Sequence, residues 1–235
     1  MNKEEFDPQE LLKSSEVFQL LPPETFRTLL NASRIERYEH RTLLVRQGQR
    51  QEHLRYIVNG HIHLTMSTAD GKSTGLPIYS GGWATWAGCF SEKAMALEAW
   101  SSKSAMFVAF PCRLVRAEVT KYPQALVRVI EHIIDTNRFL LSWVLNERVH
   151  SPEKRLAFML MALLRSTLER HEQAVITQEE IGRLGFGSRQ RVARLLRSLE
   201  LQGLIEMRYG GVKVASWETL RAFISKKDRD DILLS

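Results

Sequence analysis

Apolar positions along the chain repeat with two different periods, and the change of period divides the sequence into regions. From about residue 8 to 31 they recur at helical spacing, with a break at Pro22-Pro23, which predicts short amphipathic helices. From about residue 35 to 119, short apolar or alternating segments lie between turn signals such as Asn59-Gly60 and Asp70-Gly71. Many short strands joined in this way predict an antiparallel barrel or sandwich as the first domain.

A longer helical pattern begins at about Tyr122. Apolar residues recur there at alternating spacings of four and three, which marks a seam along one face of the helix. The seam consists of Leu126, Ile130, Ile133, Asn137, Leu140 and Val144. Ser151, Pro152 and Glu153 then have the order of an N-cap, a first-turn proline and a first-turn acid, so a new helix should begin there. The break between these two helices is the expected hinge between domains.

Two short helical patterns joined by a glycine-rich turn lie between residues 176 and 197. Thr177 followed by Glu180 has the spacing of a capping box, and Ser188 has the position of an N-cap for the second helix. Gly185 and Gly187 also lie in the turn, and they give its backbone freedom for a tight reversal. This arrangement predicts a helix-turn-helix, whose second helix enters the DNA major groove.

The two faces of these helices differ sharply in chemistry. The positions expected to face the core are Ile181, Leu184, Val192, Leu195, Leu196 and Leu199, and those expected at or beside the solvent face are Arg189, Gln190, Arg191, Arg194 and Arg197. From Ile181 to Ala215, seven basic residues stand against two acidic ones, so this stretch carries nearly all of the chain's formal charge of +6. A basic surface centred on a recognition helix is typical of a protein that binds the phosphate backbone, rather than of an ordinary solvated face.

The segment after the second helix predicts a wing. Residues 204–207 and 212–214 are apolar or alternating and flank Arg208-Tyr209-Gly210-Gly211, which is typical of a β-hairpin. The DNA-binding set expected from this winged helix comprises Thr177, Ser188, Arg189, Gln190, Arg191, Arg194, Arg208 and Lys213.

The apolar seam from Leu126 to Val144 needs a partner that covers it. Because helix-turn-helix proteins commonly read two half-sites through a two-fold axis, we expect this seam to pair with the same helix of a second chain, although the barrel of the same chain could also cover it. Asn137 could fix the register of that pair.

Composition excludes several classes of protein. At 235 residues and 44% apolar content, the chain is long enough for two ordinary domains, and no apolar run approaches the length of a membrane span. No signal peptide is visible at the N-terminus, so we expect a cytoplasmic protein. Cys89 and Cys112 are too few for a disulfide framework or a zinc site, and we expect both to be small buried hydrophobes rather than redox sensors. No catalytic motif appears, and Asp70-Gly71-Lys72-Ser73 lacks the first glycine of a phosphate loop, so no enzyme is expected.

Taken together, these motifs make the chain similar, over nearly its full length, to the cyclic-AMP receptor and fumarate-nitrate regulator (CRP/FNR) family of bacterial transcription factors. The segments that carry the resemblance are Ile176–Gly182, Ser188–Val192, Leu199–Ile205, Tyr56–Gly60, Asp70–Lys72 and Gly88–Phe90. The resemblance implies an α+β protein with three parts. These are a cyclic-nucleotide-binding-like double-stranded β-roll (jelly roll) at residues 1–120, a dimerisation helix and hinge at 121–150, and a winged helix-turn-helix at 151–235.

The same resemblance implies a function and its partners. Members of the family are homodimers that regulate transcription from a palindromic site on double-stranded DNA, and an activator would also contact RNA polymerase. The family positions matching Ser188, Arg189, Gln190 and Arg194 face the groove. A protein-interaction module with a vestigial winged helix is the rival interpretation.

The sensor departs from the cyclic-AMP-binding members. Those members carry a Gly-Glu pair ahead of the segment matching Gly88–Phe90 and an Arg-Ser pair after it, which hold the ribose and the cyclic phosphate. Here Thr85-Trp86 stand at the first pair, and the second falls in Ala96–Ala99, which contains an acid and no arginine. A buried phosphodiester without its guanidinium would be an uncompensated anion, so cyclic nucleotide is not expected. The cysteine cluster of the iron-sulfur members is also missing.

Aromatic residues occupy the pocket region instead. The candidate effector pocket consists of Trp83, Trp86, Phe90 and Trp100. These rings could fill the barrel and leave an effector-independent protein, or they could line a site for an apolar effector. His61 and His63 lie two apart on a predicted strand and could ligate haem or a metal, but such histidines are more often satisfied in other ways, so no metal and no cofactor is expected.

Overall fold

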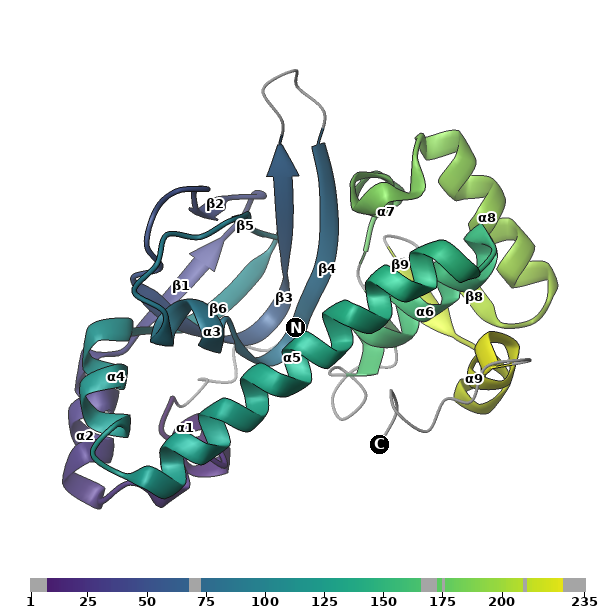
Figure 1. The fold of residues 1–235 in the computed structure, drawn as a ribbon. Helices are drawn as coiled ribbons and strands as arrows, with labels where there is room; N and C mark the ends of the chain where they lie inside the picture. Colours follow the sequence, from purple (N-terminus) through teal and green to yellow (C-terminus); the bar gives the residue numbers. More distant parts are fainter. Residues whose placement is uncertain (1–7, 68–72, 166–172, 175, 209–210, 226–235) are drawn as a thin grey trace.

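The computed structural model describes residues 8–67, 73–165, 173–174, 176–208 and 211–225 (Figure 1). The chain begins with α1 (Pro8–Ser14), the short 3-10 helix η1 (Phe18–Leu20) and α2 (Pro23–Ala32). The break at Pro22-Pro23 follows the prediction, because Pro23 occupies the first turn of α2, where its missing N–H is not needed.

An antiparallel sheet of six strands follows. Its strands are β1 (Arg34–Tyr38), β2 (Leu43–Val45), β3 (His53–Ser67), β4 (Ser73–Ala84), β5 (Glu98–Ser101) and β6 (Ala105–Pro111). The strand order is β1-β6-β3-β5-β2, and β4 pairs with β3. The first part of β3 pairs with β6 and its second part pairs with β5, so the long strand carries the sheet around a curve. The predicted β-roll is therefore confirmed, whereas Asp70-Gly71-Lys72 lie outside the described residues.

The bend in β3 depends on Gly60. This residue has a φ of +82°, and a Cβ atom there would lie 2.5 Å from the hydroxyl of Ser102. Only glycine fits such a position without displacing its neighbour. The register between β3 and β4 shifts between Ile57 and His61, which places the bulge at the same point.

Two hydrophobic clusters lie on the two faces of this sheet. One packs Leu54, Val108 and Phe110 beneath the N-terminal helices and the helices α3 (Trp86–Phe90), α4 (Cys112–Val119) and α5 (Pro123–Val149). The other contains Ile57 and Phe107 on the opposite face. Alternation along β3 and β6 explains the division, because successive side chains of a strand point to opposite faces.

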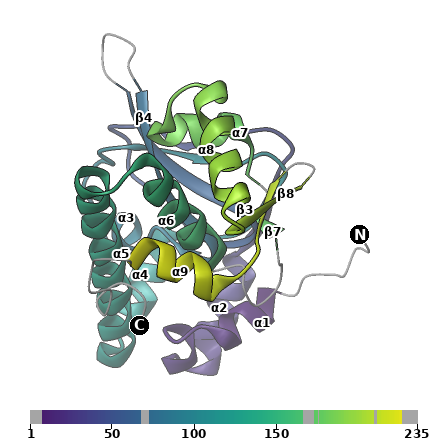
Figure 2. The same cartoon turned by 90° about the vertical axis from the view of Figure 1, so that its right-hand side faces the viewer.

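The C-terminal region is a winged helix-turn-helix. Its elements are α6 (Pro152–Arg165), β7 (Gln173–Ala174), α7 (Gln178–Ile181), the turn η2 (Gly182–Phe186), α8 (Arg189–Leu201), β8 (Ile205–Arg208), β9 (Gly211–Val214) and α9 (Trp217–Ser225). The backbone N–H of Lys154 donates to the hydroxyl of Ser151 at 3.4 Å, as expected for the predicted N-cap of α6. The helices enclose one core, and α9 packs across α6 (Figure 2).

The apolar face of α5 differs from the predicted seam. Leu126, Ile133 and Leu140 are partly buried, and Ile133 packs against the cluster beneath the sheet of the same chain. The exposed apolar residues are Val127, Ile130, Ile134, Leu141, Val144, Leu145 and Val149, and Asn137 is exposed among them. The exposed stripe therefore shares Ile130, Asn137 and Val144 with the prediction. Its other members are Val127, Ile134, Leu141 and Leu145, each of which directly follows a predicted residue, and Val149. No helix in the described parts of the chain is long and apolar enough to cross a lipid bilayer.

Candidate nucleic-acid interface and sensor region

The two helices of the helix-turn-helix begin at the predicted caps. The hydroxyl of Thr177 accepts from the backbone N–H of Glu180 at 3.2 Å, while the Glu180 carboxylate accepts from the backbone N–H of Thr177 at 2.8 Å. The hydroxyl of Ser188 accepts from the backbone N–H of Arg191 at 3.3 Å and caps α8. In the turn, Gly185 and Gly187 have φ values of +93° and +89°. The backbone of the motif is thus fixed by short-range interactions that its sequence encodes.

Helix α8 presents a basic face to solvent. Val192, Leu195, Leu196 and Leu199 are buried, and Arg189, Gln190, Arg191, Arg194 and Arg197 are exposed. Arg197 pairs with Glu200 at 2.7 Å. Within the described residues, Arg189, Arg191 and Arg194 form no ion pair, so the N-terminal half of the helix keeps its positive charge for an external anion.

The wing is attached directly to α8. Strands β8 and β9 pair in antiparallel register, which confirms the predicted hairpin, although Tyr209 and Gly210 lie outside the described residues. The Glu200 carboxylate accepts from the backbone N–H of Met207 at 3.0 Å, and this bond lowers the pKa of Glu200. Arg208 is exposed and pairs with Glu206, while Lys213 is partly exposed on β9. Thr177, at the start of α7, is also exposed.

The helix-turn-helix is docked on the sensor sheet through α7 and the turn η2. Figure 1 shows α7 between β4 and α8. A Cβ atom at Gly75 of β4 would lie 3.1 Å from the carbonyl oxygen of Arg183 and 3.3 Å from the Leu184 side chain, so strand and turn are in close contact. Leu76 packs against the core of the C-terminal region. Helix α8 lies on the far side of α7 and remains accessible.

His61 and His63 lie at this junction, and both are buried. Nε2 of His61 is 3.8 Å from a carboxylate oxygen of Glu180, and Nε2 of His63 accepts from Nε of Arg41 at 3.1 Å. Burial lowers the pKa of His61, and burial together with the charges of His61, Arg41 and Arg183 lowers the pKa of His63 to about 3. Among the described residues no group of three or more His, Cys, Asp or Glu side chains could hold a metal ion.

The predicted aromatic pocket residues separate into two places. Trp83, Trp86 and Phe90 converge with Phe18 and Phe110 beneath the sheet, where the ring centroids of Trp83 and Phe18 are 4.8 Å apart. Trp100 lies elsewhere, on β5, and the guanidinium carbon of Arg41 stands 3.7 Å from its ring centroid. Three of the four residues therefore pack with the N-terminal helices, while Trp100 supports Arg41 near the docking surface. Sequence reasoning missed Arg41 because its contacts join distant segments.

The architecture has known counterparts. No protein-family model matches the chain. It is 29% identical over 193 residues to the cAMP-activated global transcriptional regulator CRP of Salmonella typhimurium, with 78% of this chain and 91% of that protein covered. The Pasteurella multocida CRP is 27% identical over 198 residues, covering 77% of this chain and 90% of that protein.

Solved structures agree in fold. FixK2 from Bradyrhizobium japonicum superposes with a TM-score of 0.68 at 15% identity, covering 80% of this chain and 96% of that one. A putative regulator of the crp/fnr family from Eubacterium rectale gives 0.64 at 14% identity, covering 90% and 98%. The chain is therefore similar in sequence to CRP regulators and in fold to FixK2 and to the solved crp/fnr family regulator. The regulators it matches are named for control of transcription and not for an enzymatic activity.

The residues around the start of α3 depart from the pattern expected of the cyclic-AMP-binding members. Thr85, at the position of their glycine, has a left-handed φ of +70°, and its hydroxyl accepts from the Gln51 amide at 2.8 Å. Trp86, at the position of their glutamate, is 3% exposed and stacks on His132 of α5 at 5.8 Å between ring centroids. Ring packing between α3 and α5 thus takes the place of a carboxylate that could hold a ribose.

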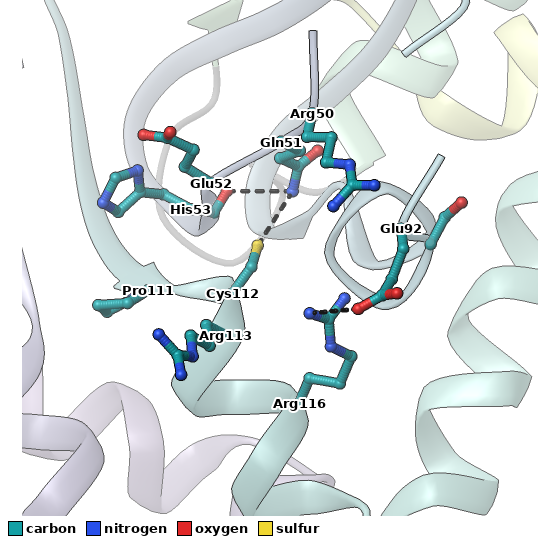
Figure 3. A pocket seen from close by; sticks show the side chains of 10 residues that line it. Arg50, Gln51, Glu52, His53, Glu92, Pro111, Cys112, Arg113 and Arg116 are labelled. Atoms are coloured by element: carbon teal, nitrogen blue, oxygen red, sulfur yellow. Dashed lines mark hydrogen bonds and ion pairs between the residues drawn. The ribbon is translucent and has the colours of Figure 1, made fainter. Parts of the chain in front are cut away.

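Two polar cavities border the start of β3. One of about 520 Å³ is lined by Glu36, Tyr38 and Arg55, where the buried carboxylate of Glu36 meets Nε of Arg55 at 2.8 Å. Burial raises the pKa of Glu36, but the charge and hydrogen bonds of Arg55, with bonds from Arg34 and Tyr38, outweigh it and lower the pKa overall. The second cavity, of about 400 Å³, is lined by Gln51, Cys112 and Arg116 (Figure 3). None of the four predicted effector-pocket residues lines either cavity.

Proposed function

We propose that this transcription regulator is a homodimer that recognises a palindromic site on double-stranded DNA through α8. The observation that carries the proposal is the exposed face of α8, on which Arg189, Arg191 and Arg194 have no acidic partner among the described residues. Uncompensated arginines on a capped helix are suited to phosphate oxygens and to guanine edges in the major groove. Arg208 and Lys213 on the wing would add backbone contacts.

The exposed stripe on α5 supports the dimer. Ile134, Leu141 and Leu145 are 50%, 65% and 62% exposed, although all three are large and apolar. A contiguous apolar stripe on one helix is unfavourable in water and is typical of an interface. Pairing two copies across a two-fold axis would bury the stripe and present two α8 helices to half-sites about 34 Å apart. RNA polymerase would be a further partner if the protein activates transcription.

For the sensor we propose that no cyclic nucleotide is required and that the effector, if the protein uses one, is of another class. The buried Trp86 and the absence of arginine in residues 96–99 leave a cyclic phosphate without a partner of opposite charge. The contacts of His61 and His63 with Glu180 and Arg41 support a protein without haem. Calorimetric titration with cyclic AMP and cyclic GMP should give no heat of binding. A dissociation constant near 10 μM, the order expected of a real site, would reverse this part of the proposal.

A selection from random DNA duplexes tests DNA recognition. The wild-type protein should recover a palindromic site, and log affinity should fall linearly with log salt. Arg189→Ala should weaken binding by about 1 to 3 kcal/mol and relax one base position, whereas Arg197→Ala, whose charge is paired with Glu200, should have a smaller effect. Recovery of an unpatterned pool would show that α8 does not read bases, and the absence of salt-dependent binding to duplex DNA would favour a vestigial winged helix.

A further inference from the structure

Two cysteines from different elements lie close together, and one of them, Cys112, lines the second cavity. Cys89 lies in α3 and Cys112 is the first residue of α4, and both side chains are buried. The Cys89 thiol donates to the backbone carbonyl oxygen of Cys112 at 3.9 Å. The two thiols are therefore neighbours, although they are far apart in sequence.

The surroundings of Cys112 favour a sulfur that accepts hydrogen bonds. The side-chain amide nitrogen of Gln51 is 3.8 Å from the Cys112 sulfur, 2.8 Å from the Thr85 hydroxyl and 3.0 Å from the carbonyl oxygens of His53 and Thr85. All four neighbours of this nitrogen are acceptors, which fixes the orientation of the amide and directs its N–H groups toward them. The other end of the amide, Oε1 of Gln51, is buried and has no hydrogen-bond partner among the residues that the structure describes.

The charges around Cys112 also favour the thiolate form of its side chain. Arg50, Arg113 and Arg116 line the cavity with Glu52 and Glu92, and Arg116 pairs with Glu92 at 3.0 Å (Figure 3). Hydrogen bonds from Cys89 and Gln51, with the charges of Arg55 and Arg116, outweigh burial and lower the pKa of Cys112. The hydrogen bond with Cys112 and burial raise the pKa of Cys89. The pair thus contains one thiolate-prone sulfur on a cavity wall and one protonated thiol behind it.

We propose that Cys89 and Cys112 form a redox-active pair that a hydroperoxide oxidises to a disulfide. The Cys112 thiolate attacks the outer oxygen of the hydroperoxide, the O–O bond breaks, and Cys112 becomes a sulfenic acid. The leaving alkoxide or hydroxide takes up from solvent the proton that the Cys112 thiol had released and departs as alcohol or water. The Cys89 thiol then attacks the sulfenic sulfur, the S–S bond forms, and water departs with the thiol proton. The cavity of about 400 Å³ is large enough for the oxidant, because a water molecule occupies only about 30 Å³.

Such a bond would tie together two elements that hold the long helix. Helix α3 contacts α5 through the stack of Trp86 on His132, and α4 leads into the start of α5. The proposed chemistry does not depend on DNA binding, so it can be tested on the purified protein alone.

The test treats reduced full-length protein with a small molar excess of hydrogen peroxide and follows its intact mass. We expect a loss of about 2 Da, a Cys89–Cys112 cross-link in the non-reduced peptide map, and recovery of both thiols on addition of dithiothreitol. The Cys89→Ala variant should leave a sulfenic acid on Cys112 that dimedone traps, and Cys112→Ala should leave Cys89 unmodified. Two free thiols in the treated wild-type protein, or a disulfide between chains in place of the internal one, would overturn the proposal.

Arg116 provides a second test that leaves both cysteines in place. Arg116→Gln should slow wild-type disulfide formation several-fold at neutral pH, because it removes a cation that favours the thiolate. Arg37→Gln, at an exposed position of β1, serves as the matched control and should leave the rate unchanged. An equal rate in all three proteins would contradict the assignment of Cys112 as the attacking sulfur, even if the cysteine variants do not fold.

Discussion

His63 shows how a buried side chain can be held in one charge state. Its Nε2 accepts a hydrogen bond from the Arg41 guanidinium, so that nitrogen must be unprotonated. A proton there would break the bond and place a second charge beside Arg41 and Arg183. Burial and these charges together explain why the pKa of His63 falls to about 3.

This depressed pKa makes stability depend on acidity. Between pH 6.5, the ordinary value, and about 3, the unfolded chain binds a proton at His63 that the folded protein does not. The free energy of unfolding should therefore fall by up to about 1.4 kcal/mol per pH unit as the solution is acidified through this window. His63→Gln retains an acceptor for Arg41 and should reduce that slope. Urea denaturation at pH 7 and pH 5 measures how the free energy of unfolding changes with pH. His40→Gln, at an exposed position, is the control. Equal pH slopes for the wild type and His63→Gln would contradict the prediction.

Gln190 is the residue at which base preference is expected to differ from that of the cyclic-AMP-responsive members. Those members carry glutamate at the matching position, and a carboxylate can only accept, which favours the amino group of cytosine. Glutamine both donates and accepts, which suits adenine. Gln190→Glu should therefore change the base selected at one position of each half-site by about 1 to 3 kcal/mol. A selection from random duplexes with the wild type and each variant measures the change in base preference. Gln202→Glu, at the far end of α8, is the control. A palindrome that Gln190→Glu leaves unchanged would count against base reading by Gln190.

At the scale of elements, contacts between residues close in sequence could be predicted, whereas contacts between distant segments could not. Thr177 and Ser188 were identifiable as caps because each accepts from a backbone N–H three residues away. The pairing of Glu36 with Arg55 joins strands β1 and β3, which are separated in the sheet by β6. The contact of His61 with Glu180 joins different regions of the chain. Neither contact leaves a periodic signal in the sequence.

Helix α5 illustrates the same limit. Its apolar spacing indicated a helix with an apolar seam. The spacing alone does not show which side of the helix packs against the rest of the same chain. Ile133 packs toward the cluster beneath the sheet, whereas Ile134 is half exposed. The face available to a partner is therefore set by packing of the N-terminal helices and α3, which the spacing of α5 does not encode.

Leu141 is consequently the position at which to test pairing. It is 65% exposed in the stripe, so Leu141→Glu should leave the folded chain intact and place a charge on each side of a desolvated interface. We expect monomers in sedimentation equilibrium and DNA binding weaker by more than about tenfold, because one half-site is then read alone. Gln124→Glu, exposed in the first turn of α5, should remain dimeric. A wild-type monomer at micromolar concentration would refute the dimer itself.

At the scale of the whole molecule, the six-stranded sheet contacts the helix-turn-helix region directly, in addition to the covalent connection through α5 and the hinge. Strand β4 contacts the turn η2 and α6, and Leu76 reaches the core of the C-terminal region. The position of α7 is thus fixed by β4 as well as by α6. A change in the curvature of β3 and β4 would reach the helix-turn-helix directly, in addition to any movement of α5.

Gly75 controls this contact sterically. A Cβ atom there would already lie 3.1 Å from the Arg183 carbonyl oxygen and 3.3 Å from both the Leu184 side chain and the Leu64 carbonyl oxygen. Valine is a good strand residue, so Gly75→Val should preserve β4 but push the turn away, at a cost of about 1 to 3 kcal/mol for overpacking.

The measurement is amide hydrogen exchange resolved by peptide. Exchange in α7 and in the turn Gly182–Phe186 should accelerate about tenfold or more in Gly75→Val, because each 1.4 kcal/mol lost from the contact raises the open population tenfold. Exchange in β6 should stay slow, which would show that the sensor sheet is still folded. Thr74→Val is the matched control, since it changes an exposed neighbour on the same strand without adding bulk at the contact. If the turn is as protected in Gly75→Val as in the control, the docking of the helix-turn-helix on β4 does not restrain it, and α5 and α6 alone must set its position.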